Sequence, residues 1–456
     1  MWRLFGNVPF QPNKIRVWQL RVSITDQSTR PHRHSPTLTK IRPTPVVNST
    51  CAWSRSDSVC RPLLKSRAPG VHHRILLTTQ FSQFNLSPAM MGQLNHHQFT
   101  IPTPVQLGAI PPALEGRDVL ATAQTGTGKT LSFLIPILER LQTMPNREAN
   151  VLILLPTREL AMQVEATFQK MRINTAHTAA LIVGGMGEGP QVRAIRRGAR
   201  IIVATPGRLE DLLNRKLVRL DKIEILVFDE VDRMLDMGFQ PAIQRIVSLL
   251  PANHQTLCYS ATLEGKVKDV ARKYLKNPTR IEVGNVLKPT ENVELRAFDV
   301  PQDKKLALLE HLLGRDKGSF LVFVRTKHGA DRVAKQLTRS GWSATQIHGD
   351  RSQSQRIAAL RSFSEGHHRI LVATDVAARG IDVADIAHVI NYDLPKVPED
   401  FVHRVGRTGR ASAKGIASTF TGPAERGDLR RIERHLSITM KRFKVNTNGS
   451  GQLTAA

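Results

Sequence analysis

The chain has 456 residues, 41% of them apolar, which is enough for two or three domains that each bury a core. Its 65 Lys and Arg against 38 Asp and Glu give a net charge of +27, which favours a polyanionic partner. The three cysteines (Cys51, Cys60 and Cys258) have neither metal-pair nor disulfide spacing, and no apolar run approaches the length of a bilayer span. A disulfide scaffold, a structural zinc site and a membrane protein are therefore excluded.

Residues 1–80 form a separate compositional zone. They hold 13 Lys and Arg against only Asp26 and Asp57, and they mix Ser, Thr, Pro and His with scattered apolar residues. No period of 3.6 or 2.0 residues is sustained, and prolines interrupt the segment. We predict that this N-terminal extension is disordered.

From residue 81 onward, short apolar runs alternate with helical patterns. The runs fall at 119–122, 151–155, 181–183, 201–203, 225–228 and 257–260. Runs of this length between amphipathic helices indicate a parallel sheet that is buried on both faces. The sequence therefore predicts a first α/β domain over residues 81–283.

A second series of apolar runs follows at 320–323, 370–374, 389–391 and 416–420. Between the two series, residues 284–292 (GNVLKPTEN) contain Gly, Pro and Asn without periodicity, which is typical of a linker. The strings RIIVAT at 200–205 and RILVAT at 369–374 give weak support for two similar halves. We predict a second α/β domain over 293–445 and a short tail over 446–456.

The segment AQTGTGKT follows the first predicted strand and precedes a helical stretch, the setting that a phosphate-binding loop requires. Its glycines let backbone N–H groups approach phosphates. Lys129 is expected to contact the β- and γ-phosphates and Thr130 to bind Mg²⁺. A chance glycine-rich turn is the alternative. The predicted nucleotide-binding residues here are Ala123, Gln124, Thr125, Gly126, Thr127, Gly128, Lys129 and Thr130.

An acidic segment, DEVD at 229–232, follows the apolar run 225–228. It therefore lies at the carboxyl end of a buried strand, where open α/β sheets bind ligands. Asp229 is expected to hold Mg²⁺, and Glu230 to orient and deprotonate a water. An isolated acidic turn is more often a solvated helix cap, but the phosphate-binding loop upstream favours the catalytic interpretation.

The segment HRVGRTGR at 403–410 has more arginine, interleaved with glycine, than an ordinary core helix. Arg407 and Arg410 are predicted to reach a γ-phosphate across a domain interface and to stabilise the transition state. The alternative is a basic RNA-binding patch without a catalytic role.

The motifs AxTGxGKT, PTREL, GG, TPGR, DExD, SAT, HGD, ARGxD and HRxGRTGR occur in the order of the DEAD-box RNA helicases. From Phe81 to about Phe443 the chain resembles this family, and it looks closest to the bacterial RhlE-like branch. The resemblance implies two tandem RecA-like domains of helicase superfamily 2, with ATP and Mg²⁺ as cofactors. It also implies a cytoplasmic monomer that binds single-stranded and duplex RNA without reading sequence, with ribosomal or RNA-decay proteins as candidate partners.

The resemblance also assigns residues around the nucleoside. The family's adenine-binding motif resembles FTIPTPVQ at 99–106, with an isolated aromatic residue upstream at Phe81. Gln106 is implied to bond the adenine edge, which would select ATP over GTP, and Phe99 to stack on the adenine face. Gly380 and Asp382 are implied to meet the ribose.

Loops that follow predicted strands resemble the family's RNA-facing sites. They are Pro156, Thr157, Arg158, Gly184, Gly185, Thr205, Pro206, Gly207 and Arg208 in the first domain, and Gly349 and Thr374 in the second. Such loops would recognise the shape of an RNA strand through its phosphates and 2′-hydroxyls. The implied interdomain coupling residues are Asp232, Ser260, Thr262 and His403.

Two positions depart from the family pattern, with Val231 in place of alanine and Gln98 in place of glycine. The implied function is an RNA-dependent ATPase that unwinds or remodels RNA duplexes and RNA–protein complexes. An ATP-regulated RNA clamp with little unwinding is the alternative, and a DNA helicase is disfavoured. Residues 1–80 could be an organellar transit peptide, a basic RNA-tethering arm or an extension outside the working protein.

Overall fold

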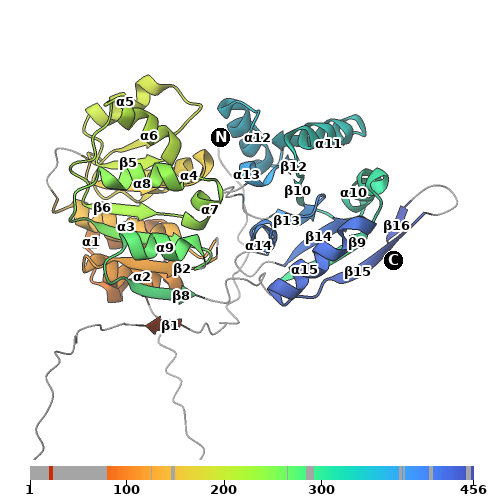
Figure 1. Cartoon of the computed structure of the whole chain (residues 1–456), viewed down its shortest axis with the longest axis horizontal. Helices are drawn as coiled ribbons and strands as arrows, with labels where there is room; N and C mark the ends of the chain where they lie inside the picture. The colour runs from red at the N-terminus through yellow and green to blue at the C-terminus, as the bar shows by residue number, and fades with distance from the viewer. Residues whose placement is uncertain are drawn as a thin grey trace, which may run out of the picture. The chain divides into compact units, whose positions relative to one another are not determined.

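The computed structural model describes residues 20–23, 80–124, 126–144, 149–263, 265–283, 292–378, 383, 386–409, 414–447 and 453–455. Within these ranges the chain forms two sheets of mainly parallel strands, each flanked by helices (Figure 1). The predicted α/β class with two successive parallel sheets is confirmed.

The first sheet has the strand order β1-β8-β2-β7-β6-β3-β5-β4, in which β1 alone is antiparallel to its neighbour. Its strands are β1 (Leu20–Ser23), β2 (Val119–Thr122), β3 (Val151–Leu154), β4 (Ala179–Ile182), β5 (Ile201–Ala204), β6 (Ile225–Phe228), β7 (Gln255–Ser260) and β8 (Thr279–Val283). Its helices are η1 (Phe81–Phe84), α1 (Pro88–His96), α2 (Pro104–Leu114), α3 (Lys129–Leu141), α4 (Arg158–Met171), α5 (Glu188–Arg196), α6 (Pro206–Asn214), α7 (Val231–Asp236), α8 (Gln240–Ser248) and α9 (Lys266–Tyr274).

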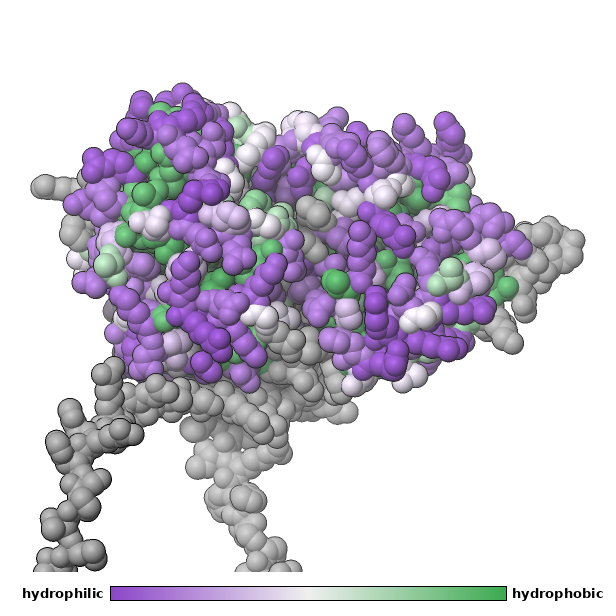
Figure 2. All heavy atoms as spheres, viewed as in Figure 1, coloured by the Kyte–Doolittle hydropathy of each residue, from purple (hydrophilic) through white to green (hydrophobic). Residues whose placement is uncertain are grey.

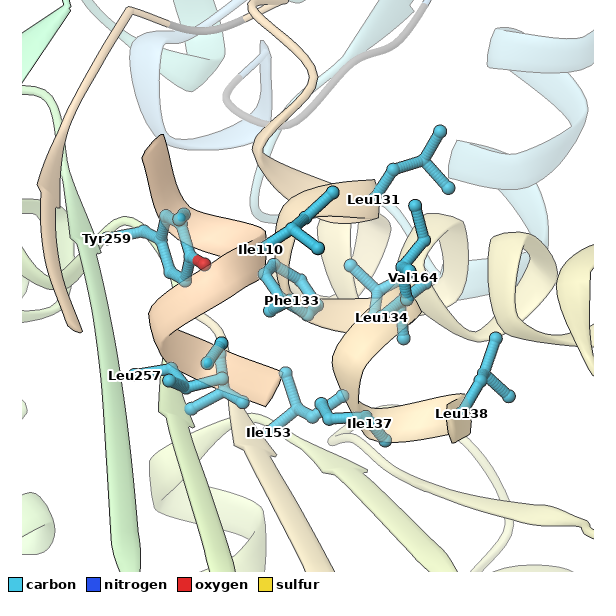
Figure 3. Close-up of a cluster of buried hydrophobic side chains, with 14 of the residues drawn as sticks. Ile110, Leu131, Phe133, Leu134, Ile137, Leu138, Ile153, Val164, Leu257 and Tyr259 are labelled. Carbon is cyan, nitrogen blue, oxygen red and sulfur yellow. The ribbon is translucent and has the colours of Figure 1, made fainter. Parts of the chain in front are cut away.

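This sheet is buried on both faces, which explains its uninterrupted apolar runs. In β3, Val151 and Ile153 join a core built with α1 to α4, whereas Leu152 and Leu154 join the opposite core, built with α5 to α9. Alternate side chains of a strand point to opposite faces, so a strand covered on both sides must be apolar at every position. Figure 3 shows part of the first core, with Ile110, Phe133, Leu134, Ile137, Ile153 and Leu257 labelled.

Strand β1 lies inside the segment predicted to be disordered. Leu20 pairs with Val283 and Ser23 with Arg280, so these four residues extend the sheet at the β8 edge. The prediction of disorder does not hold for these four residues, and the rest of residues 1–79 lies outside the described part of the chain.

The second sheet has the strand order β11-β12-β10-β13-β14-β9-β15-β16. Its strands are β9 (Val293–Asp299), β10 (Ser319–Phe323), β11 (Ala344–Ile347), β12 (Ile370–Ala373), β13 (Ile386–Asn391), β14 (Gly415–Thr421), β15 (Lys441–Thr447) and β16 (Leu453–Ala455). Its helices are η2 (Gln302–Lys304), α10 (Lys305–Arg315), α11 (Lys327–Arg339), α12 (Gln353–Ser364), α13 (Asp375–Ala378), α14 (Pro398–Val405), η3 (Pro423–Glu425) and α15 (Arg426–Leu436).

In β10, Phe320 and Val322 face a core shared with α10 and α11, and Leu321 and Phe323 face a core shared with α12 to α15. Strand β15 runs past the predicted domain end at residue 445, and β16 pairs with it antiparallel where a tail was predicted. Residues 284–291 of the predicted linker lie outside the described residues.

The order of the first sheet brings its motifs to one edge. Parallel strands end at the same edge, so the segments that follow neighbouring strands are neighbours in space. In the order β2, β7, β6, β3, β5 and β4, these segments contain the phosphate-binding loop, Thr262, Asp229, Thr157, Thr205 and Gly184. The nucleotide motifs therefore fall at one end of this row and the predicted RNA loops at the other.

Candidate active site

The phosphate-binding loop connects β2 to α3, as predicted. Gly128 has a φ of 90°, and Lys129 begins the helix. Lys129 is 6% exposed and donates from Nζ to the carbonyl of Ala123 at 3.1 Å, while the Thr127 hydroxyl donates to the Gln124 carbonyl at 2.7 Å. The amine thus lies inside the loop, beside the helix N-terminus that would receive phosphates. Gly126 and Thr130 are in the described loop, and Thr125 lies outside the described residues.

The acidic motif follows β6 and begins α7. Asp229 and Glu230 are 3% and 5% exposed, and Glu230 has a left-handed φ of 52°. Burial raises the pKa of Asp229 to about 7, although Lys129 opposes the rise. Residues held in this backbone region cluster at active sites.

A divalent cation fits these carboxylates. Asp229 Oδ1 and Glu230 Oε2 are buried and have no hydrogen-bond partner among the described residues. Buried carboxylate oxygens in that state are costly unless a cation or an ordered water satisfies them. Asp229 and the hydroxyl of Thr130 are oxygen ligands of the kind that Mg²⁺ prefers.

The last acidic residue of the motif joins β6 to β7. Asp232 accepts from the backbone N–H of Ala261 through Oδ2 and from that of Arg233 through Oδ1, both at 3.0 Å. The Ser260 hydroxyl accepts from the N–H of Thr262 at 3.2 Å. The predicted coupling segment at 260–262 is therefore tied directly to the acidic motif.

Gln106 connects the predicted adenine site to the phosphate-binding loop. Its Nε2 donates to the Gly128 carbonyl at 3.1 Å, and its Oε1 accepts from the N–H of Thr103 at 2.9 Å. A Cβ on Gly128 would lie 2.6 Å from Gln106 Nε2, so only glycine fits there. The carboxamide keeps one N–H and one lone pair for a ligand.

The two aromatic residues predicted to meet adenine have different surroundings. Phe99 is 40% exposed and can offer a ring face. Phe81 is 2% exposed, and its ring packs edge-on against Phe84 in the first core. In this structure Phe81 therefore has no face for a base, and it supports the site by packing.

Both departures from the family pattern have a place in the fold. Gln98 follows α1 with a φ of 58°, and the N–H groups of Gln98 and Phe99 donate to the carbonyls of Asn95 and Leu94. This is the left-handed helix ending that glycine usually occupies. Val231 is fully buried in the core that contains α7, so its two extra methyl groups are absorbed by packing.

The glycine pair of the first domain lies under an arginine. A Cβ at Gly184 would stand 3.0 Å from Arg158 Nη2, and one at Gly185, whose φ is 74°, would stand 2.1 Å from Nη1. Gln191 of α5 fixes the same loop, accepting from the Val183 N–H at 3.2 Å and donating to the Val183 carbonyl at 2.9 Å. The role of Gln191 was not predicted, because a glutamine in a helix gives no signal by itself.

Other predicted RNA-facing residues stand at helix starts. Thr157, next to the buried Pro156, caps α4 by accepting from Leu160 N–H at 3.3 Å, and Thr205, Pro206 and Gly207 begin α6. Arg208 is already paired, with Asp211 at 2.7 Å and with Glu188 at 3.1 Å. The turn into α6 therefore offers its backbone N–H groups to an anion more readily than this guanidinium.

In the second domain, Asp331 of α11 organises the segment after β11. Its Oδ1 accepts from Gln346 at 3.2 Å, from His348 at 3.1 Å and from Arg351 at 3.0 Å. Gly349 lies between the last two donors and is exposed, with open space around its Cα. After the neighbouring strand β12, the carbonyl of Thr374 accepts from Ala378 N–H at 2.9 Å.

The arginine-rich segment divides into different roles. Arg404 is 2% exposed and fixes α14 to its own domain through Asp375, at 2.6 and 2.8 Å, and Asn391, at 3.1 Å. His403 and Arg407 line one small cavity together with Arg233, which follows the acidic motif. Arg410, and the predicted ribose contacts Gly380 and Asp382, lie outside the described residues.

Glu159 makes contacts with the second domain that were not predicted. Glu159, of the PTREL segment, forms an ion pair with Arg356 at 2.8 Å and accepts a hydrogen bond from Gln353 at 3.1 Å, both on α12. Gln353 and Arg356 are three residues apart, so they lie on one face of the helix. The loops proposed to face RNA in the two domains are thus joined by a buried ion pair.

Known proteins are similar to this chain in sequence and in fold. The chain matches the DEAD/DEAH box helicase family over residues 103–270 and the helicase conserved C-terminal domain over 303–412. It is 42% identical over 373 residues to the DEAD-box ATP-dependent RNA helicase CshA of Bacillus subtilis, covering 81% of this chain and 75% of that protein. It is 46% identical over 349 residues to DEAD-box ATP-dependent RNA helicase 30 of Arabidopsis thaliana, covering 75% and 59%.

Solved structures of DEAD-box proteins have a similar fold. Dbp5 of S. cerevisiae bound to RNA and ADP BeF3 superposes with a TM-score of 0.73 at 32% identity, over 80% of this chain and 95% of that one. Mss116p bound to ssRNA and AMP-PNP gives a TM-score of 0.74 at 27% identity, over 81% and 79%. The two sheets and their helices are therefore tandem RecA-like domains, as predicted.

Proposed function

The chain belongs to the DEAD-box family of ATP-dependent RNA helicases, and we propose that it couples ATP turnover to local opening of RNA duplexes and RNA–protein complexes. The observation that carries the proposal is the arrangement of the first domain. Its phosphate-binding amine, its buried carboxylates and its glycine-arginine loop lie along one edge of a single sheet. The RhlE-like branch stays a prediction.

ATP is proposed to bind between Phe99, Gln106 and the loop 123–130. Lys129 would exchange its bond to the Ala123 carbonyl for the β- and γ-phosphates. Thr130 and Asp229 would hold Mg²⁺, which when bound neutralises charge on these phosphates. Because Gln106 already contacts Gly128, adenine bound at Gln106 would change the position of the phosphate-binding loop.

Hydrolysis is proposed to use Glu230 to orient the attacking water and accept its proton. Arg407, and Arg410 beside it, would supply positive charge to the γ-phosphate from the second domain, with His403 as a further contact between the domains. Neither domain holds a complete site, so turnover depends on their closure.

RNA is the proposed reason that the domains close. A strand lying along the Arg158 loop and the Gly349 segment would touch both domains next to the pair Glu159–Arg356. Phosphates and 2′-hydroxyls would be bound by backbone N–H groups and helix N-termini, without sequence readout. Figure 2 shows mainly hydrophilic side chains on the described surface that it presents, and with a net charge of +27 the affinity should fall steeply with added salt.

The chain is further proposed to act as a cytoplasmic monomer, with ribosomal or RNA-decay proteins as candidate partners. No helix among the described residues has the length and apolar character of a bilayer span.

Two variants and a strand-displacement assay test the proposal. Lys129→Ala should abolish RNA-stimulated ATP turnover, because the developing phosphate charge loses its main cation. Glu230→Gln should bind ATP and RNA yet hydrolyse slowly, because the amide cannot accept a proton. Displacement of a short RNA strand by the parent chain separates unwinding from the alternative, an ATP-regulated clamp, which would hydrolyse ATP without releasing the strand. Stimulation by DNA of the same sequence would point instead to a helicase indifferent to the 2′-hydroxyl.

A further inference from the structure

Arg233 is a buried cation beside the proposed catalytic base. It lies on α7, and its guanidinium is 2% exposed. Its Nε is 3.9 Å from Glu230 Oε2, one helical turn away. A charge that is this well shielded from solvent interacts strongly with its neighbours and is costly to leave unbalanced.

A second ion pair of Arg233 crosses to the second domain. Its Nη1 lies 3.5 Å from Oδ1 of Asp400, whose side chain is 15% exposed. Asp400 is on α14, the helix that also contains His403 and precedes Arg407. Asp400, His403 and Arg407 line the same small cavity as Arg233. One guanidinium therefore stands between the acidic motif and the arginine-bearing helix.

We propose that Arg233 and Asp400 are positioning residues, through which closure of the domains is transmitted to the carboxylate of Glu230. The inference rests on the proposed function, in which Glu230 prepares the water. In the arrangement of this structure, Asp400 attracts the same guanidinium as Glu230, through Nη1 at 3.5 Å against Nε at 3.9 Å. When the domains part, Asp400 moves away with α14, and the attraction of Arg233 for Glu230 is no longer opposed by that helix.

This arrangement gives α14 two separate tasks. Arg407 would bring positive charge to the phosphate, while Asp400 would balance the cation beside the base. Loss of Asp400 should therefore slow the hydrolysis step and leave nucleotide binding intact, because the adenine and phosphate contacts lie elsewhere. If Asp400 acts through Arg233, the effects of the two substitutions on kcat should not be additive, because removing either partner ends the same interaction.

The test compares Asp400→Asn, Arg233→Met and the double variant in steady-state ATPase assays with saturating RNA. Each single variant should lower kcat by about 10-fold, a typical size for coupling between sites, with little change in KM for ATP. The double variant should be no slower than the slower single variant. Glu399→Gln is the matched control, because Glu399 neighbours Asp400 on α14 but its carboxylate pairs with His435 of the same domain at 3.6 Å. That control should keep the parent rate.

Closure is measured separately, by energy transfer between dyes at positions 222 and 339, with RNA and a non-hydrolysable ATP analogue. Asp400→Asn should reduce the closed fraction, and Glu399→Gln should not. The inference is overturned if Asp400→Asn matches Glu399→Gln in both assays, or if the two single effects multiply in the double variant. Absence of RNA-stimulated ATPase in the parent chain would instead end the proposed function. Because Asp400→Asn alters only a partly exposed carboxylate, it keeps the test decisive should Arg233→Met fail to fold.

Discussion

The guanidinium of Arg158 occupies the space that a side chain at position 185 would need, because a Cβ on Gly185 would lie 2.1 Å from Arg158 Nη1. A substitution at Gly185 must therefore displace the arginine proposed to meet RNA, whatever it does to the backbone. Gly198 has a similar φ of 86° but open space around its Cα, so it isolates the backbone effect.

We expect Gly185→Ala to weaken binding of single-stranded RNA by about 10-fold, the loss of one charge-assisted contact. Gly198→Ala should leave RNA affinity unchanged. Both variants should lose about 1 kcal/mol of stability, because alanine disfavours the left-handed conformation. Fluorescence anisotropy with labelled RNA and urea unfolding measure the two effects. Equal RNA affinities for the two variants would show that the position of Arg158 does not matter.

Gln98 has a left-handed backbone conformation that is unfavourable for a residue with a side chain, at a position where the family has glycine. We expect Gln98→Gly to stabilise the first domain by about 1 kcal/mol, since the left-handed helix ending favours glycine. Lys216, with a φ of 56° after α6, is the matched control for stability. Lys216→Gly should give a similar gain in urea unfolding. Only Gln98→Gly should also change KM for ATP, because Gln98 directly precedes Phe99, which is proposed to stack on adenine. An unchanged KM for ATP would argue that Phe99 does not contact adenine.

Asp229 is predicted to lower the stability of the metal-free chain near neutral pH. Burial raises the pKa of Asp229 to about 7 in the fold, above the value of about 3.9 expected when unfolded. The stability from this group is therefore complete below about pH 4 and is lost as the pH rises through about 7. Asp229→Asn removes the titration. In EDTA at about pH 8 the variant should be more stable than the parent by about 1–3 kcal/mol, although inactive, and the difference should shrink towards about pH 4. A pH-independent difference in urea unfolding would contradict this assignment.

The features that could be predicted from sequence were those with a local signature. Continuous apolar runs predicted strands covered on both faces, and the glycines around Lys129 predicted a loop between a strand and a helix. The contacts of Arg233 with Asp400 and of Glu159 with Arg356 join residues 167 and 197 positions apart, and their charges have no periodic pattern. Such pairs depend on the placement of whole elements. Phe81, predicted to meet adenine, packs in the core in this structure, because an isolated aromatic residue can equally be a core residue.

Asp331 is predicted to support RNA binding without touching RNA. Three donors of the β11–α12 segment converge on its Oδ1, and Gly349 is held between two of them. Burial alone would raise the pKa of Asp331. The hydrogen bonds from His348 and Gln346 outweigh burial and lower that pKa. The carboxylate is therefore charged throughout the neutral range.

Asp331→Leu removes all three bonds, and the segment after β11 should become less ordered. We expect the RNA concentration for half-maximal ATPase to rise by about 5-fold, with kcat at saturating RNA nearly unchanged, since only a binding surface is loosened. Asp331→Asn keeps an acceptor but loses the charge. Its RNA concentration for half-maximal ATPase should lie between those of Asp331→Leu and the parent chain. The control is Asp428→Asn, because Asp428 pairs with its helix neighbour Arg431 at 3.3 Å in an exposed setting. Should Asp331→Leu lower kcat and leave the RNA dependence unchanged, the residue would act on closure of the domains, and the segment that it holds would not be an RNA contact.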